Sequence, residues 1–244
     1  MLTKEQRETS PEARVAPLKI LAQAEVPSLL VHEIYESVQG ESTWAGVPCV
    51  FIRTTGCHLR CTYCDTAHAF NDGVLRAVDD VFADVTARGV PLIEVTGGEP
   101  LLQGATPALL TRLLDAGHTV LVETSGAVGI AGLDPRARLI VDVKTPASGE
   151  HARHRWQDLP LLKPGLDELK FVIVDEADYV WAREQVLSRP IPRGVTVLFS
   201  PAATAGSSTS GFAAWLAERI VADRLPVRFQ VQLHKVLWGD RRGV

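Results

Sequence analysis

Short apolar runs alternate along the chain with stretches in which apolar residues recur three and four positions apart. The apolar runs are rich in Val, Ile, Leu and Phe and predict strands over 30–36, 49–54, 92–96, 119–123, 139–143, 169–174, 195–200 and 228–233. The helical spacing predicts helices over 78–88, 106–116, 177–187 and 211–223, with Gly89 and Gly117 typical of helix ends. Strands joined by crossover helices indicate an α/β fold with a largely parallel sheet.

The 244 residues and their 46% hydrophobic content suit a single globular domain. Residues 1–28 mix both charge signs with several prolines, so we expect a poorly ordered leader there and one domain over 29–244. Residues 144–166 contain three prolines and little periodicity, which predicts a long connection of the kind often used for function.

Net charge and hydropathy narrow the class of partner. A formal net charge of -4 provides no broad cationic surface for nucleic acid, so a small-molecule substrate is favoured. No run approaches the roughly 18 to 20 apolar residues of a membrane span, and the first residues lack the apolar core of a secretory signal. We expect a cytoplasmic protein that binds neither nucleic acid nor membrane.

Three of the four cysteines lie within eight positions, as Cys57, Cys61 and Cys64 in the pattern C-x-x-x-C-x-x-C. Three thiolates on one loop, with no fourth cysteine nearby, leave one iron of a 4Fe-4S cluster open for another ligand. Two alternatives remain, a zinc site completed by His58 or His68 and three purely structural cysteines. Cys49 stands apart in an apolar run and is expected to pack as a small buried hydrophobe.

Further motifs directly follow predicted strands, and ligands of parallel α/β folds bind at the carboxyl ends of strands. The motifs are Thr96-Gly97-Gly98-Glu99-Pro100, Glu123-Thr124-Ser125-Gly126, Asp142-Val143-Lys144 and Ser200-Pro201. Taken singly, each has a plainer interpretation: a glycine turn, a helix-capping turn, or a strand-end ion pair between Asp142 and Lys144.

Together, the cysteine loop and Gly-Gly-Glu-Pro resemble the radical S-adenosylmethionine (SAM) superfamily. Within it, the chain from His32 onward resembles the 7-carboxy-7-deazaguanine synthase family. The segments that carry this resemblance are 33–42, Phe51-Ile52-Arg53, Cys61-Thr62-Tyr63-Cys64-Asp65-Thr66 and 232–239.

The resemblance implies an abridged, open β/α partial barrel and a homodimer. It implies conversion of 6-carboxy-5,6,7,8-tetrahydropterin to 7-carboxy-7-deazaguanine with release of ammonia, on a route to deazapurines such as queuosine. Such an enzyme uses a 4Fe-4S cluster, SAM and Mg²⁺, and receives electrons from a donor such as flavodoxin or ferredoxin. The cofactors carry the radical chemistry, so no catalytic side chain is assigned with certainty.

The resemblance also implies roles for individual residues. The cluster ligands are Cys57, Cys61 and Cys64, and the Mg²⁺ ligand is Thr66. The substrate-binding residues are Val38, Gln39, Gly40, Glu41, Arg53 and Thr96. The SAM-binding residues are Tyr63, Cys64, Asp65, Gly98, Asp142, Val143, Lys144, Ser200, Pro201, Ala202 and Ala203. His234 and the residues around it are expected near the substrate pocket.

Each role has a plainer alternative: a polar turn for residues 39–42, a rim salt bridge for Arg53 and a backbone-bonded loop hydroxyl for Thr66. Two other functions also remain open. A glycyl-radical-enzyme activase would share the cysteine loop and Gly-Gly-Glu-Pro but act on a protein, and a non-catalytic iron-sulfur or zinc module would bind no SAM.

Overall fold

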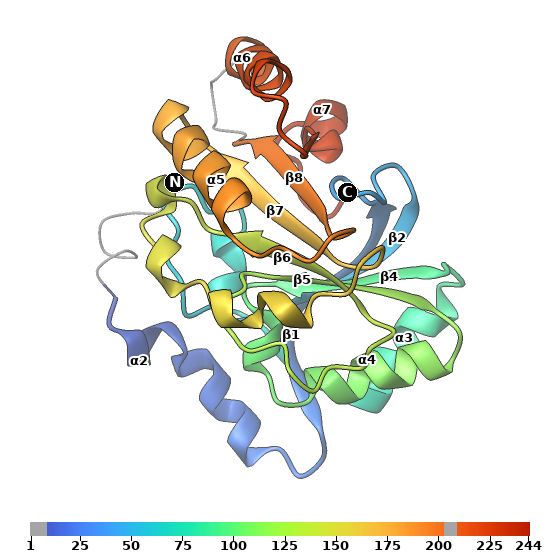
Figure 1. Cartoon of the computed structure of the whole chain (residues 1–244). Helices are drawn as coiled ribbons and strands as arrows, with labels where there is room; N and C mark the ends of the chain where they lie inside the picture. The colour runs from blue at the N-terminus through green and yellow to red at the C-terminus, as the bar shows by residue number, and fades with distance from the viewer. Residues whose placement is uncertain (1–8, 203–208) are drawn as a thin grey trace.

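The computed structural model describes residues 9–202 and 209–244 (Figure 1). Within these residues, one nine-stranded sheet has the order β3-β1-β2-β4-β5-β6-β7-β8-β9. The strands are β1 (Ser28–Val38), β2 (Pro48–Thr54), β3 (Val74–Ala77), β4 (Leu92–Gly97), β5 (Thr119–Thr124), β6 (Arg138–Val143), β7 (Glu168–Ile173), β8 (Thr196–Pro201) and β9 (Arg228–Phe229).

The α-helices are α2 (Pro11–Arg14), α3 (Val78–Ala87), α4 (Thr106–Asp115), α5 (Glu176–Ser188), α6 (Thr209–Ala222) and α7 (Leu233–Trp238). Short 3-10 helices are η1 (Ala16–Gln23), η2 (Ala67–Phe70), η3 (Pro100–Leu102), η4 (Pro146–Ser148), η5 (His151–Arg153) and η6 (Trp156–Leu161). Figure 1 shows α3 and α4 close together, while α5 and α6 lie beside β7 and β8.

Neighbouring strands in the order β2-β4-β5-β6-β7-β8-β9 pair in parallel, which confirms the predicted α/β fold. β1 instead pairs antiparallel with both β2 and β3. Residues 39–47 connect β1 to β2 and are too few for the crossover of about a dozen residues that parallel pairing requires. The cysteine loop occupies the next connection, where the described chain has only η2 and the edge strand β3 before α3.

The four predicted helices are confirmed to within two residues at each end. The predicted strand over 228–233 is wrong in its second half, because β9 ends at Phe229 and α7 begins at Leu233. The alternating side chains of this segment suit a strand, but β8 offers only Leu198 and Phe199 as partners. The chain then turns toward the end of β1, where Leu233 N donates to Gly40 O at 2.8 Å.

The expected leader is partly helical. Ser10 Oγ accepts from Ala13 N at 3.3 Å and caps α2, and η1 follows with Pro17 in its first turn. Leu18 of η1 packs beside Gly56, where an added Cβ would lie 2.8 Å from Leu18 Cδ2. Residues 1–8 of the expected leader lie outside the described residues.

The two faces of the sheet differ in chemistry. On the face covered by helices, alternate residues such as Val50, Ile52 and Val95 join the main hydrophobic core with side chains of α3 to α6. On the other face, the beginnings of the strands carry a smaller apolar cluster that includes Phe51 and the fully buried Cys49, which confirms the prediction for that cysteine. Strand residues two apart share a face. The side chains further along this same face are polar. This inner face therefore leads to a polar carboxyl edge.

Candidate active site

The three clustered cysteines lie on the loop between β2 and η2, at the carboxyl edge of the sheet. Cys57 and Cys61 are buried and pack with Leu59 and Phe70, and Cys64 is half-buried against the same cluster. Burial raises the pKa of Cys57 to about 12 and that of Cys61 to about 11. Such thiols stay protonated and inert until a metal cation displaces the proton.

The spacing of the three sulfur atoms is informative about the kind of metal group. Among the described residues, the one group of three potential ligands whose atoms all lie within 4.8 Å of one another is His32, Glu33 and His68. The three cysteine sulfurs therefore do not all lie within 4.8 Å of one another. In a 4Fe-4S cluster each cysteine binds a different iron, so the spread fits a cluster better than a zinc ion.

Arg60 and the connection after β6 hold the cysteine loop in shape. Arg60 Nη1 donates to the carbonyls of Cys57 and Leu59, both at 2.7 Å, and its guanidinium lies 4.0 Å from the Phe70 ring centroid. Thr62 N donates to Ser148 O at 3.0 Å.

Glu150 secures the same loop from the connection between β6 and β7. Its Oε1 accepts from Arg60 N at 2.7 Å and from Arg14 Nη1 of α2 at 3.1 Å. Residues 144–166 thus form an ordered series of 3-10 turns that supports the cysteines.

The Gly-Gly-Glu-Pro motif sits directly against the cysteine loop. A Cβ on Gly98 would lie 2.2 Å from Gly56 O and 3.0 Å from Cys57 Cβ, so only glycine allows this approach. Glu99 N donates to Gly56 O at 2.8 Å, which fastens the end of β4 to the start of the cysteine loop.

The buried Glu99 carboxylate joins this motif to the end of β5. Its Oε1 accepts from Thr124 Oγ1 and its Oε2 from Ser125 N, both at 2.8 Å. No helix begins between β5 and β6 in this described stretch, so the helix-capping interpretation of residues 123–126 is wrong. The two motifs form one unit at the strand ends.

A buried network of charges covers the inner face beside the cysteine loop. Lys170 Nζ lies 2.6 Å from Glu41 Oε2 and 3.5 Å from Asp142 Oδ2, and it also contacts Glu123 Oε1. Burial alone would lower the pKa of Lys170, but Glu123, Glu41 and Asp142 outweigh it and the pKa is raised well above its usual value. Lys170 therefore stays charged.

The loop after β1 is drawn into this network. Gln39 Oε1 accepts from Glu41 N at 2.7 Å, and Gln39 Nε2 donates to Glu94 Oε2. Burial, reinforced by Glu123, raises the pKa of Glu94 well above its usual value. Residues 39–41 therefore form more than a surface turn, with Gln39 buried and linked to β4.

The C-terminal segment, which contains His234, closes against the same loop. Gln232 Nε2 donates to Glu41 Oε1 at 2.7 Å. A Cβ on Gly40 would lie 2.1 Å from His234 Nδ1, so glycine is required for this contact.

Arg53 and Thr96 occupy the polar part of the inner face on β2 and β4. Arg53 Nε donates to Glu33 Oε1 at 2.8 Å and Nη2 to Tyr35 OH at 2.7 Å. The salt bridge foreseen as an alternative for Arg53 exists, and it holds the guanidinium half-buried in the site. Thr96 Oγ1 donates to Glu123 Oε2 at 3.3 Å.

Asp142 and Lys144 form the strand-end ion pair considered as an alternative, with Lys144 Nζ 2.8 Å from Asp142 Oδ2. Burial alone would raise the pKa of Asp142, but Lys144 and Lys170 outweigh it and the pKa is lowered. Asp142 Oδ1 is buried without a hydrogen-bond partner in the described structure, which leaves one acceptor for a ligand. Val143 points into the helix-side core, so only its backbone can serve the site.

The remaining candidates lie around the same edge. Tyr63 OH is 3.5 Å from Thr145 Oγ1, and Thr66 Oγ1 donates to Asp65 Oδ1 at 2.8 Å rather than to backbone. Ser200 and Pro201 end β8, and Ala202 N donates to Ile173 O at 2.9 Å. Ala203 lies outside the described residues.

Two members of the network, Glu94 and Lys170, were not identified from the sequence. Glu94 is the one charged residue of β4, in Leu-Ile-Glu-Val-Thr-Gly, and Lys170 lies between apolar residues of β7, in Glu-Leu-Lys-Phe-Val-Ile. Charged side chains are rarely buried unless paired, so a charged residue between apolar residues of a predicted strand indicates a polar inner face.

Comparisons with known proteins agree with this geometry. Residues 51–144 match the model of the Radical SAM superfamily. A 7-carboxy-7-deazaguanine synthase from Chlorobaculum tepidum is 42% identical over 219 residues, covering 88% of this chain and 97% of that protein. A second, from Koribacter versatilis, is 41% identical over 225 residues, covering 88% and 99% respectively.

The chain belongs to the 7-carboxy-7-deazaguanine synthase family. The fold agrees, since the crystal structure of QueE from Escherichia coli matches with a TM-score of 0.71 at 21% identity, covering 85% of this chain and 95% of that one. Membership of this family makes the protein an enzyme of the radical SAM superfamily and implies a 4Fe-4S cluster and SAM as cofactors. No helix within the described ranges is long and apolar enough to cross a membrane.

Proposed function

We propose that this enzyme converts 6-carboxy-5,6,7,8-tetrahydropterin to 7-carboxy-7-deazaguanine with release of ammonia, as a carbon-nitrogen lyase of deazapurine biosynthesis of the queuosine type. The observation that carries the proposal is the meeting, at one edge of the sheet, of a buried three-cysteine loop and a polar inner face. The name of the family describes the product, and the residues of that face suit a carboxylated pterin.

Cys57, Cys61 and Cys64 are assigned as the cluster ligands. These three cysteines would hold the cluster and leave one iron open for SAM, and the cluster with SAM would supply radical hydrogen abstraction. The burial of Cys57 and Cys61 supports the assignment, because a packed apolar pocket excludes water and competing reactions from reactive species.

The polar inner face supplies the substrate contacts. Gln39 and Glu41, with the backbone of Val38 and Gly40, can pair with the donor and acceptor edge of a pterin. Arg53 can meet the substrate carboxylate with its planar fork, since Glu33 and Tyr35 already fix the orientation of its guanidinium. Thr96 completes the set from β4. The chain's own work is thus to hold the pterin and keep water out.

SAM is assigned to residues of the cysteine loop and of the neighbouring strand ends. The contacts come from side chains or backbone of Tyr63, Cys64, Asp65, Gly98, Asp142, Val143, Lys144, Ser200, Pro201, Ala202 and Ala203. The unpartnered Asp142 Oδ1 is a suitable acceptor for a hydroxyl or ammonium donor.

Thr66 is assigned to Mg²⁺. A single hydroxyl would leave the other ligand positions of the ion to substrate oxygens and water. The half-buried Thr66 hydroxyl lies beside the exposed Asp65 carboxylate, which supports cation binding at this position.

The assembly and partners complete the proposal. We expect a cytoplasmic homodimer of single-domain subunits, with residues 1–28 as an N-terminal extension and a flavodoxin or ferredoxin as electron donor. Analytical ultracentrifugation of the reconstituted enzyme tests the dimer independently of activity.

The function is tested by supplying the reconstituted enzyme with SAM, dithionite, Mg²⁺ and tetrahydropterins with or without the 6-carboxylate, and following products by mass. Only the carboxylated pterin should give 7-carboxy-7-deazaguanine. Arg53→Lys should raise KM for it about tenfold or more, because lysine lacks the fork, while the exposed control Arg193→Lys should not. SAM cleavage with no deazapurine product would instead favour an activase that acts on a protein.

A further inference from the structure

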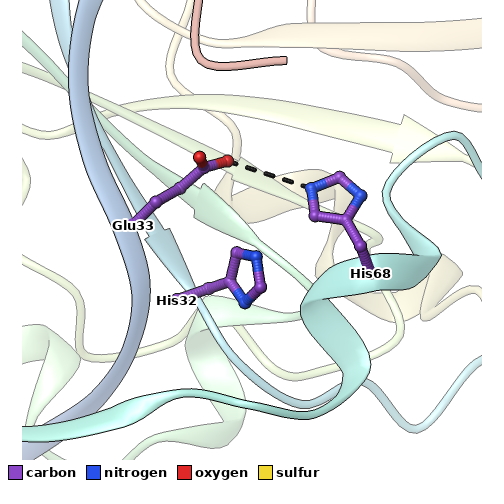
Figure 2. A group of neighbouring side chains, drawn as sticks. All are labelled: His32, Glu33 and His68. Carbon is purple, nitrogen blue, oxygen red and sulfur yellow. Dashed lines mark ion pairs between the residues drawn. The ribbon is translucent and has the colours of Figure 1, made fainter.

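His32, Glu33 and His68 come together outside the residues assigned above to the cluster, SAM, Mg²⁺ and substrate. One ligand atom from each lies within 4.8 Å of the other two. Figure 2 shows the three side chains directed toward a common space, with His32 and Glu33 from β1 and His68 from η2. Glu33 Oε1 is 3.9 Å from His68 Nε2.

An irregularity in β1 makes this arrangement possible. Adjacent residues of a regular strand point to opposite faces, so His32 and Glu33 would not normally share a site. Val31 pairs with Thr54 and Glu33 with Arg53, so β1 contains one residue more than β2 over this step. The extra residue is His32, and a bulge of this kind re-aims side chains.

The two histidines lack the partners that buried imidazoles usually have. Nδ1 of His32 and Nδ1 of His68 are both buried, and neither has a hydrogen-bond partner in the described part of the chain. Their ring centroids are 5.1 Å apart at an interplanar angle of 58°, so the rings are tilted rather than stacked. The contact of His68 with Glu33 is made by Nε2, so neither imidazole is held in its orientation by a hydrogen bond at Nδ1, and both rings can turn toward a shared ion.

Glu33 can serve this site without abandoning Arg53. Both of its contacts among the described residues, to Arg53 Nε and to His68, use Oε1, which leaves Oε2 available. Arg53 is also held by Tyr35 OH, so its position does not depend on Glu33 alone.

We propose that His32, Glu33 and His68 bind one divalent transition-metal ion of the zinc type. Two imidazoles and a carboxylate form a usual three-ligand zinc set, which leaves a fourth position for water. Two ligands of a tetrahedral zinc ion lie about 3.4 Å apart, so the 3.9 Å between Glu33 and His68 needs only a small side-chain movement. Imidazole nitrogen disfavours Mg²⁺, so this site is chemically distinct from the hydroxyl site at Thr66.

The bound ion would fasten β1 to η2, immediately after the cysteine loop. The proposal does not depend on the substrate of the enzyme, because it concerns only the affinity of the protein for the metal ion and the stability of the fold.

The test uses protein with its cluster assembled, so that the cysteines are occupied, and Zn²⁺ as the probe in anaerobic calorimetry. One Zn²⁺ should bind per chain with no loss of iron, should raise the unfolding temperature, and should persist in a large excess of Mg²⁺. His32→Ala and His68→Ala should each weaken binding about tenfold or more. His118→Ala, which replaces a half-buried histidine directly before β5, is the matched control and should bind like the parent.

Glu33→Gln, which preserves side-chain size, gives a second test if an alanine variant does not fold. Binding to the parent no tighter than to a His32→Ala/His68→Ala double variant would overturn the proposal. Equal weakening in His118→Ala would overturn it as well, because the effect would then not belong to this site.

Discussion

Lys170 Nζ lies 2.6 Å from Glu41 Oε2, which joins the middle of β7 to the loop that follows β1. The same ammonium contacts Glu123 on β5 and lies 3.5 Å from Asp142 Oδ2 on β6. One buried cation thus neutralises carboxylates from three strands or loops. It fixes the separation of the proposed substrate-binding loop and the proposed SAM-binding strand end.

Replacing this cation should destabilise the whole fold. Lys170→Met keeps the length of the side chain but leaves the surrounding carboxylates buried without their partner, and removing one member of a buried ion pair costs about 3–5 kcal/mol. Urea unfolding should show a loss of that size, whereas the exposed control Lys19→Met should change stability by less than about 0.5 kcal/mol. Equal stability of the two variants would mean that the network is not held together by Lys170.

Glu94 should make stability depend on pH. Burial and Glu123 raise the pKa of Glu94 in the folded protein, although Lys170 opposes them, so the fold holds this proton more tightly than the unfolded chain does. The contribution of Glu94 is then fully present below its unfolded pKa of about 4.3 and is lost as pH rises through the raised folded pKa. Glu94→Gln removes that loss.

The free energy of unfolding, measured by urea titration between pH 4 and pH 8, tests this expectation. Relative to the parent, Glu94→Gln should gain stability with rising pH by an amount on the order of 1 kcal/mol, the value of one pKa unit. The exposed control Glu184→Gln should run parallel to the parent. Parallel curves for parent and Glu94→Gln would contradict the raised pKa.

Gly98 should be essential for a correctly formed cysteine loop. In Gly98→Ala the new Cβ would fall 2.2 Å from Gly56 O and 3.0 Å from Cys57 Cβ, so the loop must move. We expect reduced iron and sulfide per chain after reconstitution and a loss of about 1–3 kcal/mol in stability. Gly104→Ala, where an added Cβ meets nothing within 4 Å, is the control and should retain full iron content. Full iron in both variants would show that the close approach is unimportant.

The sequence predicted the strand-end motifs well because each contains residue types with a specific chemical or backbone requirement. The spacing alone puts Cys57, Cys61 and Cys64 on one loop, and the missing Cβ of Gly98 predicts a close backbone approach. The contact of Glu99 with Thr124 and Ser125 could not, since it joins two strand ends that are neighbours only in the folded sheet.

Other parts of the site depend on tertiary packing that the sequence does not encode locally. Lys170 meets Glu41 across 129 positions of sequence. His32 faces His68 only because β1 carries an extra residue opposite β2, which no local pattern indicates. The predicted C-terminal strand is too long for a similar reason. Contact with Gly40, rather than the alternation of side chains, decides where β9 ends.

The central claim is that the buried cysteine loop supports radical conversion of a carboxylated pterin on the polar inner face. The most direct measurement is anaerobic formation of 7-carboxy-7-deazaguanine from 6-carboxytetrahydropterin by parent, Cys61→Ala and Cys49→Ala proteins, each supplied with SAM, dithionite and Mg²⁺. The parent and Cys49→Ala should form the product, since Cys49 only packs in the apolar cluster, and Cys61→Ala should form none. Product from Cys61→Ala at the parental rate, or none from a parent with a full cluster, would contradict the account.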